Sequence, residues 1–228
     1  MRLILARHGR TASNTGHLID TGLPGADLDQ VGRRQALALR DRLGRRPIQA
    51  VYASSLVRSQ QTAEPLAQAL GLPVLVLDGL REISAGQWDQ VAVGASGQPN
   101  PYTTMLLAWL NGDRTATVPG GETVERFLAR FEAALATVAA AGPDLALVVS
   151  HASALAVWCS SRLAGFAELS PAAWFGHVGH IEVAGAAPDG LRLVDSSAIG
   201  GWSPEPACSQ PTTPAASAGA VSPAAAKT

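Results

Sequence analysis

The chain has 228 residues, of which 47% are hydrophobic and 15% are charged, and its formal net charge is −1. This length suits one large domain or two small ones, and the composition is typical of a soluble globular protein and not of a disordered chain. The near-neutral charge gives no indication of a nucleic-acid partner or of a membrane surface as partner.

Local patterns exclude further classes of protein. The two cysteines, Cys159 and Cys208, lie in a helical pattern and in a Pro/Ser/Ala-rich stretch, so no structural disulfide is expected. Cysteine and histidine do not cluster at zinc-ligand spacing, and neither a metal nor another cofactor is predicted. The apolar stretch at residues 3–6 is too short for a signal peptide or a membrane span. We therefore expect a cytoplasmic, metal-free protein.

Short apolar runs alternate with longer helical patterns along the chain. The runs predict buried strands at residues 3–6, 50–53, 74–77 and 145–149. Helical spacing and capping residues predict helices from Asp29 (as N-cap) to Leu43, after Ser55, from about Thr123 to Gly142-Pro143, and from Ala152 to Leu163. Near the end, residues 181–183 and 191–194 flank Pro188-Asp189-Gly190 and predict an antiparallel hairpin.

The order of these elements predicts the fold class and the domain organisation. Strands that alternate with helices indicate an α/β three-layer sandwich, in which helices cover both faces of a mostly parallel sheet. Residues 84–118 have weak periodicity and are interpreted as an insertion over the sheet and the active site. Residues 203–228, dominated by Ala, Pro, Ser and Thr, are interpreted as a disordered tail. One domain is therefore expected over residues 1–202.

Polar residues whose side chains can take part in catalysis follow each of the four predicted strands. They are Arg7, His8, Arg58, Glu82 and His151. Functional groups gather at the carboxyl ends of parallel strands, so these five side chains are expected to meet at one edge of the sheet. For any single one, a surface arginine or a hydrogen-bonded histidine is the simpler interpretation, but all five together are hard to explain as structure alone. Arginine binds phosphate oxygens, a neutral imidazole attacks phosphorus, and a carboxylic acid protonates the departing alkoxide.

Five blocks of sequence resemble the histidine phosphatase superfamily, in its phosphoglycerate mutase-like branch. The blocks are "ARHGRTASN", "VYASSLVRSQQTAEPLA", "LREISAGQW", "PGGETVERFLARF" and "VVSHASAL". They follow one another in the family's order between about Leu3 and Val194. A lone RHG triplet would be weak evidence, whereas five ordered blocks are specific.

The resemblance implies a role for each of the five residues. His8 is implied as the phosphorylated nucleophile and Glu82 as the proton donor. Three residues are implied to hold the phosphoryl oxygens, namely Arg7, Arg58 and His151. Asn14 is implied to form a further hydrogen bond to the phosphate.

Four positions depart from the family pattern. Arg10 follows the RHG triplet in place of a common Glu or Gln, and it either lies at the pocket mouth or faces solvent. Leu18 stands where many relatives carry an arginine that reaches the substrate. The neighbouring His17 is only a weak candidate to replace that arginine. Ala152 follows the second histidine in place of glycine, so its methyl group narrows the pocket or shifts the backbone. His177 stands in place of an asparagine and either reaches the pocket or is a solvated loop histidine.

Three further features each have a functional and a structural interpretation. Thr11 either donates its hydroxyl near the phosphate or packs its loop. Gly120-Gly121-Glu122 resembles a phosphate cradle, but it is better interpreted as a turn and a helix start, with Glu122 in the favourable first turn. Large side chains of the insertion either line a substrate pocket or, as such clusters more often do, form a core: Trp88, Tyr102, Met105, Leu106, Trp109 and Leu110.

The leading predicted function is a phosphomonoesterase that acts on a small organic phosphate. The alternatives are a mutase, which would return the phosphoryl group to a bound product, and a catalytically silent binding module, which the presence of the five residues disfavours. Residues 84–118 contain one basic residue, Arg114, and position 18 is leucine, so substrates with an uncharged or apolar group beyond the phosphate are expected. The predicted partner is a small phosphate ester, with no nucleic acid and no membrane; the sequence does not predict the oligomeric state.

Overall fold

The computed structural model of the chain, which describes residues 1–93, 100–166, 175–186 and 190–200, contains a six-stranded sheet with the strand order β3-β2-β4-β1-β5-β6. The strands are β1 (Arg2–Arg7), β2 (Ala50–Ala53), β3 (Val74–Val76), β4 (Leu145–Ser150), β5 (His180–Ala186) and β6 (Gly190–Asp195). The four strands predicted from apolar runs lie next to one another at one side of the sheet, and the predicted hairpin supplies the other side.

Strand direction agrees with the predicted fold class. The pairs β1–β4, β2–β4 and β2–β3 are parallel, whereas β5 is antiparallel to β1 and to β6. The central strand β4 is buried along its whole length, as expected for a parallel strand covered on both faces. The predicted turn residues Pro188 and Asp189 lie outside the described residues.

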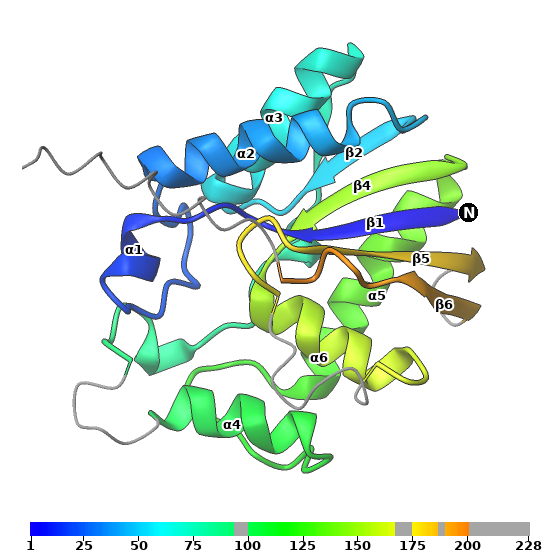
Figure 1. Cartoon of the computed structure of the whole chain (residues 1–228). Coiled ribbons are helices and arrows are strands. Elements are labelled where there is room, and N and C mark those ends of the chain that lie inside the picture. Colours follow the sequence, from blue (N-terminus) through cyan, green and yellow to red (C-terminus); the bar gives the residue numbers. More distant parts are fainter. Residues whose placement is uncertain (94–99, 167–174, 187–189, 201–228) are drawn as a thin grey trace, which may run out of the picture.

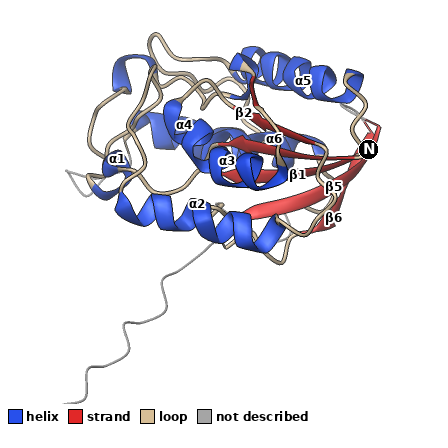
Figure 2. Ribbon diagram, turned by 90° about the horizontal axis from the view of Figure 1, so that it is seen from above, coloured by secondary structure: helices blue, strands red, loops and turns tan. Residues whose placement is uncertain are grey.

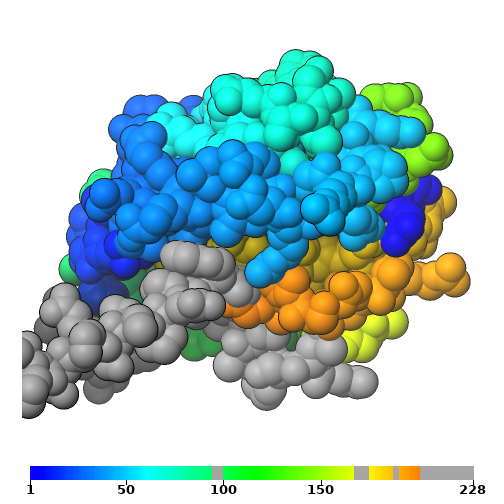
Figure 3. All heavy atoms as spheres, turned by 45° about the horizontal axis from the view of Figure 1, so that its top comes forward, coloured from blue at the N-terminus to red at the C-terminus, as the bar shows by residue number. Residues whose placement is uncertain are grey.

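Helices cover both faces of the sheet (Figures 1 and 2). On one face lie α2 (Gln30–Leu43) and α3 (Val57–Leu70), which pack side by side and form a continuous outer surface (Figure 3). On the other face lie α5 (Val124–Ala140) and α6 (Ala152–Arg162), with α4 (Pro101–Leu110) packed beyond α6 (Figure 1). The three-layer α/β sandwich is thereby confirmed.

Successive side chains of β1 point to opposite faces of the sheet and so contribute to both hydrophobic clusters of the core. Leu3 and Leu5 belong to the apolar cluster beneath α4, α5 and α6, while Ile4 and Ala6 belong to the cluster beneath α2 and α3. All four side chains are 0–1% exposed. Helices cover both faces of the sheet at β1, and residues 3–6 are accordingly apolar at every position.

Capping residues set the helix starts that the sequence predicts. The Asp29 side chain accepts the backbone N–H of Gly32 at 2.7 Å, and the Thr123 side chain accepts that of Arg126 at 3.3 Å. The expectation for Glu122 was wrong, because this residue precedes the N-cap and Glu125 is the acid of the first turn. Glu122 instead forms an ion pair with Arg130 at 2.6 Å.

The insertion contains a helix, α4, that the sequence analysis did not predict. Asn100 caps it by accepting the Thr103 N–H at 2.8 Å, and Pro101 occupies its first turn. Its buried side chains follow helical spacing and join the core of α5 and α6, which confirms the core interpretation for Met105 and Trp109, whereas Tyr102 and Leu106 belong to this core and also line a pocket. Trp88 and Leu110 pack against that core while partly exposed.

The two ends of the insertion are pinned to each other. The Ser84 N–H donates to the Glu122 carboxylate at 3.1 Å, and the Glu122 N–H donates to the Ser84 carbonyl at 3.2 Å. The chain therefore leaves the sheet domain and returns to it at one point. Gly86 allows a close approach of backbones there, because a Cβ on it would lie 2.3 Å from atoms of Gly120 and Gly121.

Within the described ranges, none of the helices combines the length and the apolar character that a membrane crossing requires. Cys159 is buried and unpaired by any disulfide, while Cys208 lies outside the described residues.

Candidate active site

The five polar residues that follow the parallel strands meet at one edge of the sheet. Because β3, β2, β4 and β1 are neighbours with parallel direction, their carboxyl ends lie side by side. Four of the five residues, Arg7, His8, Arg58 and Glu82, line a pocket of about 320 Å³. The ring of the fifth, His151, lies 5.1 Å from the ring of His8, measured between centroids. The predicted convergence is therefore present in the structure.

Two hydrogen bonds define the protonation of His8. Nδ1 lies 2.7 Å from the carbonyl oxygen of Gly9, which can only accept, so Nδ1 carries the proton. At the other side of the ring, Nε of Arg58 donates to Nε2 at 3.1 Å, so Nε2 holds a lone pair. Burial, together with the charges of Arg58 and Arg7, keeps the pKa of His8 well below its usual value. His8 is thus a neutral imidazole with Nε2 as its basic atom.

A close backbone contact fixes the loop that carries His8. Gly32, in the first turn of α2, lies against Arg10, and a Cβ at this position would stand 2.0 Å from the Arg10 carbonyl oxygen. The Gly9 N–H in turn donates to the Thr62 hydroxyl on α3 at 2.9 Å. Both helices of this face therefore hold the loop between them.

Asp20 orients Arg58, and the sequence analysis did not identify it. Nη2 of Arg58 donates to the Asp20 backbone carbonyl at 2.7 Å, and Nη1 lies 3.5 Å from the Asp20 carboxylate. That carboxylate is itself held by the Ser13 hydroxyl at 2.8 Å and the Ala26 N–H at 3.0 Å. Asp20 also lines the pocket. The guanidinium is thereby fixed with its Nε toward His8.

Two serines orient His151, the N-cap residue of α6. The Ser54 hydroxyl accepts the Leu56 N–H at 3.3 Å and lies 2.7 Å from Nε2 of His151, with the Ser59 hydroxyl at 3.3 Å. A serine hydroxyl has one proton and two acceptor positions, so Ser54 can donate to Nε2 while it accepts the Leu56 N–H, and the proton of the neutral ring then lies on Nδ1. Burial lowers the pKa of His151 well below its usual value, so this ring is neutral.

Three buried donor atoms around His8 have no hydrogen-bond partner among the described residues. They are Nε of Arg7, Nη1 of Arg58 and Nδ1 of His151. Nη1 of Arg7 donates to the Phe175 carbonyl at 2.8 Å. Burial lowers the pKa of Arg7 to about 10, so its guanidinium remains cationic at neutral pH. Buried donors are almost always satisfied, and three unsatisfied ones beside a cationic cluster indicate a site for an anion that offers several acceptor oxygens.

Glu82 lies at the N-terminus of α6. Its carboxylate accepts the N–H groups of Ile83 and Ala154 at 2.9 and 2.8 Å and that of Ser153 at 3.2 Å. The loop that carries it is also held by Arg130 on α5, which lies on the same face of the sheet as α6. The guanidinium of Arg130 donates to three carbonyl oxygens of this loop at 2.8–2.9 Å, namely those of Gly79, Arg81 and Glu82. Sequence reasoning missed Arg130, because an arginine on an amphipathic helix gives no local sign of such contacts.

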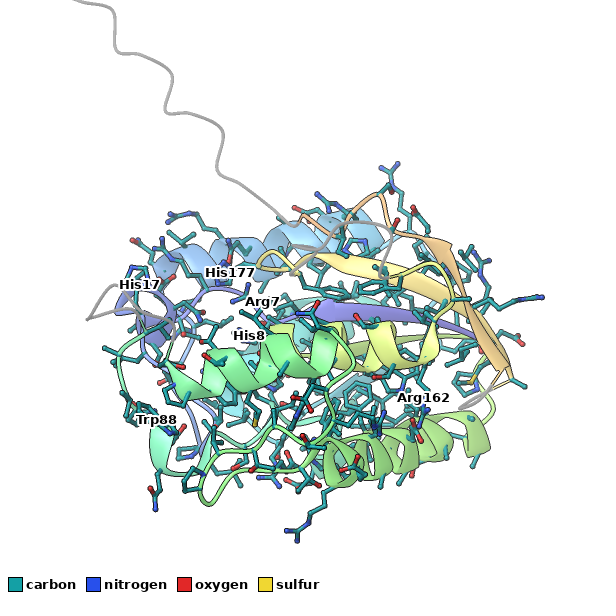
Figure 4. All side chains as sticks on the ribbon, turned by 90° about the horizontal axis from the view of Figure 1, so that it is seen from below. Arg7, His8, His17, Trp88, Arg162 and His177 are labelled. Carbon is teal, nitrogen blue, oxygen red and sulfur yellow. The ribbon has the colours of Figure 1, made fainter. Side chains whose placement is uncertain are left out.

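Asn14 and Thr11 line the pocket beside His8, as expected. The Asn14 amide oxygen accepts the Thr11 N–H at 3.0 Å and faces Nε2 of His177 at 3.1 Å, so the amide nitrogen is the group left to donate. His177 thus reaches the edge of the site, with its ring centroid 6.4 Å from that of His8 (Figure 4). Thr11 also caps α1 (Ala12–Thr15), and its hydroxyl donates to the Asn14 amide oxygen at 3.1 Å, which supports the loop-packing role over donation to a phosphate.

Of the remaining candidate residues, some line the pocket and others do not. Ala152 lines the pocket, and its methyl group lies where the sequence analysis expected narrowing. Arg10 is not among the pocket-lining residues, and its Nε donates to the Asp29 carboxylate at 2.7 Å. His17 is exposed and lies away from Arg7 and His8 (Figure 4). Leu18 lines the pocket and His17 does not, so the cation that many relatives place here is not replaced by His17.

The buried neutral histidines predict a pH-dependent stability. Folding lowers the pKa of His8 and of His151, so below about pH 6.5 the unfolded chain binds protons that the folded chain does not. We expect the free energy of unfolding to fall on acidification from pH 7 to pH 5, with a slope that approaches about 1.4 kcal/mol per pH unit below pH 6.5 for each of these two histidines and for His177, whose pKa burial lowers to about 3. Urea unfolding at several pH values measures this slope. His8→Asn should reduce it by about one histidine's share; an unchanged slope would contradict the burial of a neutral ring.

Comparisons with known proteins agree with this geometry. A family model described as the histidine phosphatase superfamily (branch 1) matches residues 3–194. The PE-PGRS family protein PE_PGRS11 of Mycobacterium tuberculosis is 44% identical over 86 residues, which cover 37% of this chain and 15% of that protein. The glucosyl-3-phosphoglycerate phosphatase of Mycobacterium tuberculosis is 33% identical over 143 residues, which cover 63% of this chain and 62% of that protein. The chain therefore spans less than two thirds of the length of these curated relatives.

A solved structure is similar over nearly its whole length. A mycobacterial glucosyl-3-phosphoglycerate phosphatase in complex with VO3 has a TM-score of 0.69 and 27% sequence identity. The similarity covers 86% of this chain and 98% of that chain.

Proposed function

The chain belongs to the histidine phosphatase superfamily, and from this membership and its site we propose that it hydrolyses small organic phosphate monoesters through a phosphohistidine at His8. The observation that carries the proposal is a neutral His8 beside buried side-chain nitrogens that make no hydrogen bond among the described residues, namely Nε of Arg7, Nη1 of Arg58 and Nδ1 of His151. A phosphoryl group brings three acceptor oxygens, which such donors can bind.

The first half-reaction transfers the phosphoryl group to His8. The Nε2 lone pair forms an N–P bond while the bond between phosphorus and the alcohol oxygen breaks. The departing oxygen takes a proton from the Glu82 carboxyl, so a neutral alcohol leaves. The Nδ1–H bond to the Gly9 carbonyl keeps the ring in place and stabilises the positive charge that develops on the imidazole.

The second half-reaction regenerates the enzyme. Glu82, now a carboxylate, removes a proton from a water molecule as the water oxygen attacks phosphorus. The N–P bond breaks, the electron pair returns to Nε2, and inorganic phosphate is released. Arg7 and Arg58 stabilise the charge on the phosphoryl oxygens in both steps, and the Asn14 amide supplies a further donor.

Phosphate release from a panel of sugar phosphates, phosphoglycerates, nucleotides and aryl phosphates tests this proposal. We expect hydrolysis of p-nitrophenyl phosphate, whose leaving group needs little protonation, and of at least one alkyl ester. If no ester releases phosphate, the protein is a silent binding module and the proposal fails.

A mutase reaction is the alternative, and the charge of the site argues against it. A mutase that uses a bisphosphate holds an anionic group at each end of its substrate, and each desolvated anion needs its own cations. Among the described residues that line the pocket, the cations are Arg7 and Arg58, and both lie beside His8.

We therefore expect water to be the preferred acceptor. With 3-phosphoglycerate and catalytic 2,3-bisphosphoglycerate, phosphate release should exceed formation of 2-phosphoglycerate by at least about tenfold, since each missing charge-assisted contact is worth roughly a factor of ten or more. An enolase-coupled assay, run in parallel with a phosphate assay, measures both products. Formation of 2-phosphoglycerate faster than phosphate would establish the mutase instead.

A further inference from the structure

Beyond the phosphate-binding donors, one wall of the pocket is aliphatic. It consists of Leu18, Ile19, Val93 and Leu106, which we call the aliphatic wall. Ile19 and Leu106 are buried, at 6% and 3% exposure, whereas Leu18 and Val93 are 36% and 41% exposed. The wall therefore extends from the interior of the pocket to its solvent-exposed mouth.

Backbone pairing gives the aliphatic wall a defined shape. Residues 17–19 and 91–93 form a short ladder, in which the Ile19 N–H donates to the Val91 carbonyl at 3.0 Å and the Val93 N–H to the His17 carbonyl at 2.6 Å. Leu18 and Ala92 form an antiparallel bridge within it. Leu106 is contributed by α4. An apolar group that enters the pocket thus meets a preformed surface.

The charges of the pocket oppose a second anion. Its lining holds two cations, Arg7 and Arg58, and two acidic residues, Asp20 and Glu82; with Glu82 protonated as the proposed acid, a phosphate dianion still leaves excess negative charge. Three nearby arginines are engaged elsewhere through ion pairs of 2.6–3.3 Å: Arg10 with Asp29, Arg114 with Glu125, and Arg130 with Glu122. Residues 94–99, which adjoin Val93 in the chain, contain no basic residue in the sequence.

We propose, resting on the proposed phosphatase function, that the alcohol half of the substrate is an aliphatic chain without a second anionic group, held along the aliphatic wall. Leu18 and Leu106 then determine specificity through carbon contacts, while the Asp20 carboxylate repels carboxylates and further phosphates. Each methylene group that leaves water against such a surface increases kcat/KM by about fourfold, until the chain passes the mouth.

Two series of synthetic substrates test the inference. Ethyl, butyl and hexyl phosphate should show a kcat/KM that increases with chain length. The second comparison pairs 3-methylbutyl phosphate with the phosphate ester of 3-hydroxypropanoic acid, in which a carboxylate replaces an isopropyl group of the same shape. We expect the alkyl ester to be preferred by at least about 100-fold in kcat/KM, because the carboxylate would be desolvated without a cation.

A single substitution should move this preference. Leu18→Arg places a cation at the wall and should reduce the ratio between the two esters at least about tenfold. Leu37→Arg is the matched control, since Leu37 is 41% exposed on α2 and is not among the pocket-lining residues. An equal rate for both esters in the unmodified protein, or an unchanged ratio in Leu18→Arg, would overturn the inference. Failure of p-nitrophenyl phosphate hydrolysis as well would instead overturn the proposed function on which it rests.

Discussion

His8→Ala is expected to lower kcat by at least about 10⁴-fold for every phosphate ester, because removal of a covalent nucleophile leaves only binding and charge stabilisation. In the structure Nε2 is the lone-pair atom of a neutral ring whose proton is held on the far side by the Gly9 carbonyl. The neighbouring ring of His151 does not replace it, since its Nε2 faces Ser54 at 2.7 Å.

Rapid quenching identifies the intermediate directly. Brief exposure to a ³²P-labelled ester, followed by denaturation, should leave label on the protein that is stable in base and lost in acid, as expected for a phosphoramidate. His8→Ala should carry no label. His17→Asn is a suitable control, because His17 is exposed and has a φ of 53°, a conformation that asparagine tolerates. Turnover near the unmodified rate in His8→Ala would exclude the phosphohistidine mechanism.

Glu82→Gln is expected to separate substrates by their leaving groups. An alkoxide needs its proton in the transition state, whereas a nitrophenolate leaves without one, so hydrolysis of an alkyl phosphate should fall by about 10²–10⁴-fold and that of p-nitrophenyl phosphate by much less. Steady-state kcat values for the two esters measure the difference. Equal losses on both would assign Glu82 to binding or to structure.

Stability must be measured on the same variant, because Glu82 also caps α6. A glutamine can keep its oxygen on the N–H groups of Ile83 and Ala154, but its amide nitrogen then faces the Ser153 N–H. A loss of about 1–3 kcal/mol in the free energy of unfolding is expected from that unmet donor. Glu125→Gln serves as the control, since this carboxylate lies on the surface and pairs with Arg114.

The catalytic residues could be predicted from the sequence because their positions depend only on the short strands that precede them in the chain. Each of His8, Arg58, Glu82 and His151 follows a short apolar strand within a few residues. Parallel neighbours must then bring those positions to one edge, whatever the rest of the chain does. Apolar runs and capping residues such as Asp29 define those strands and helices without reference to distant residues.

The supporting residues could not be predicted in this way. Asp20 lies in an irregular loop, and its contact with Arg58 depends on how that loop folds across α3. Arg130 acts on carbonyl groups of residues about 50 positions earlier in the chain. Helix α4 did carry a signal, in Asn100-Pro101 and in apolar residues at 102, 105, 106 and 109, but glycine- and threonine-rich flanks obscured the period.

Two hydrogen bonds join Ser84 to Glu122, so the segment between these residues begins and ends at one point of the fold. We call this segment, residues 85–121, the cassette, because it could be exchanged for another. The groups that hold Glu82 in place, Arg130 and the first turn of α6, lie outside this cassette. A segment of different length, transplanted between these two residues, would therefore carry a new alcohol-binding surface, and it would have to keep the pairing of residues 91–93 with residues 17–19, next to Asp20, for the catalytic groups to stay in place. The graft would have to bring its own apolar helix, since Tyr102 and Trp109 belong to the core.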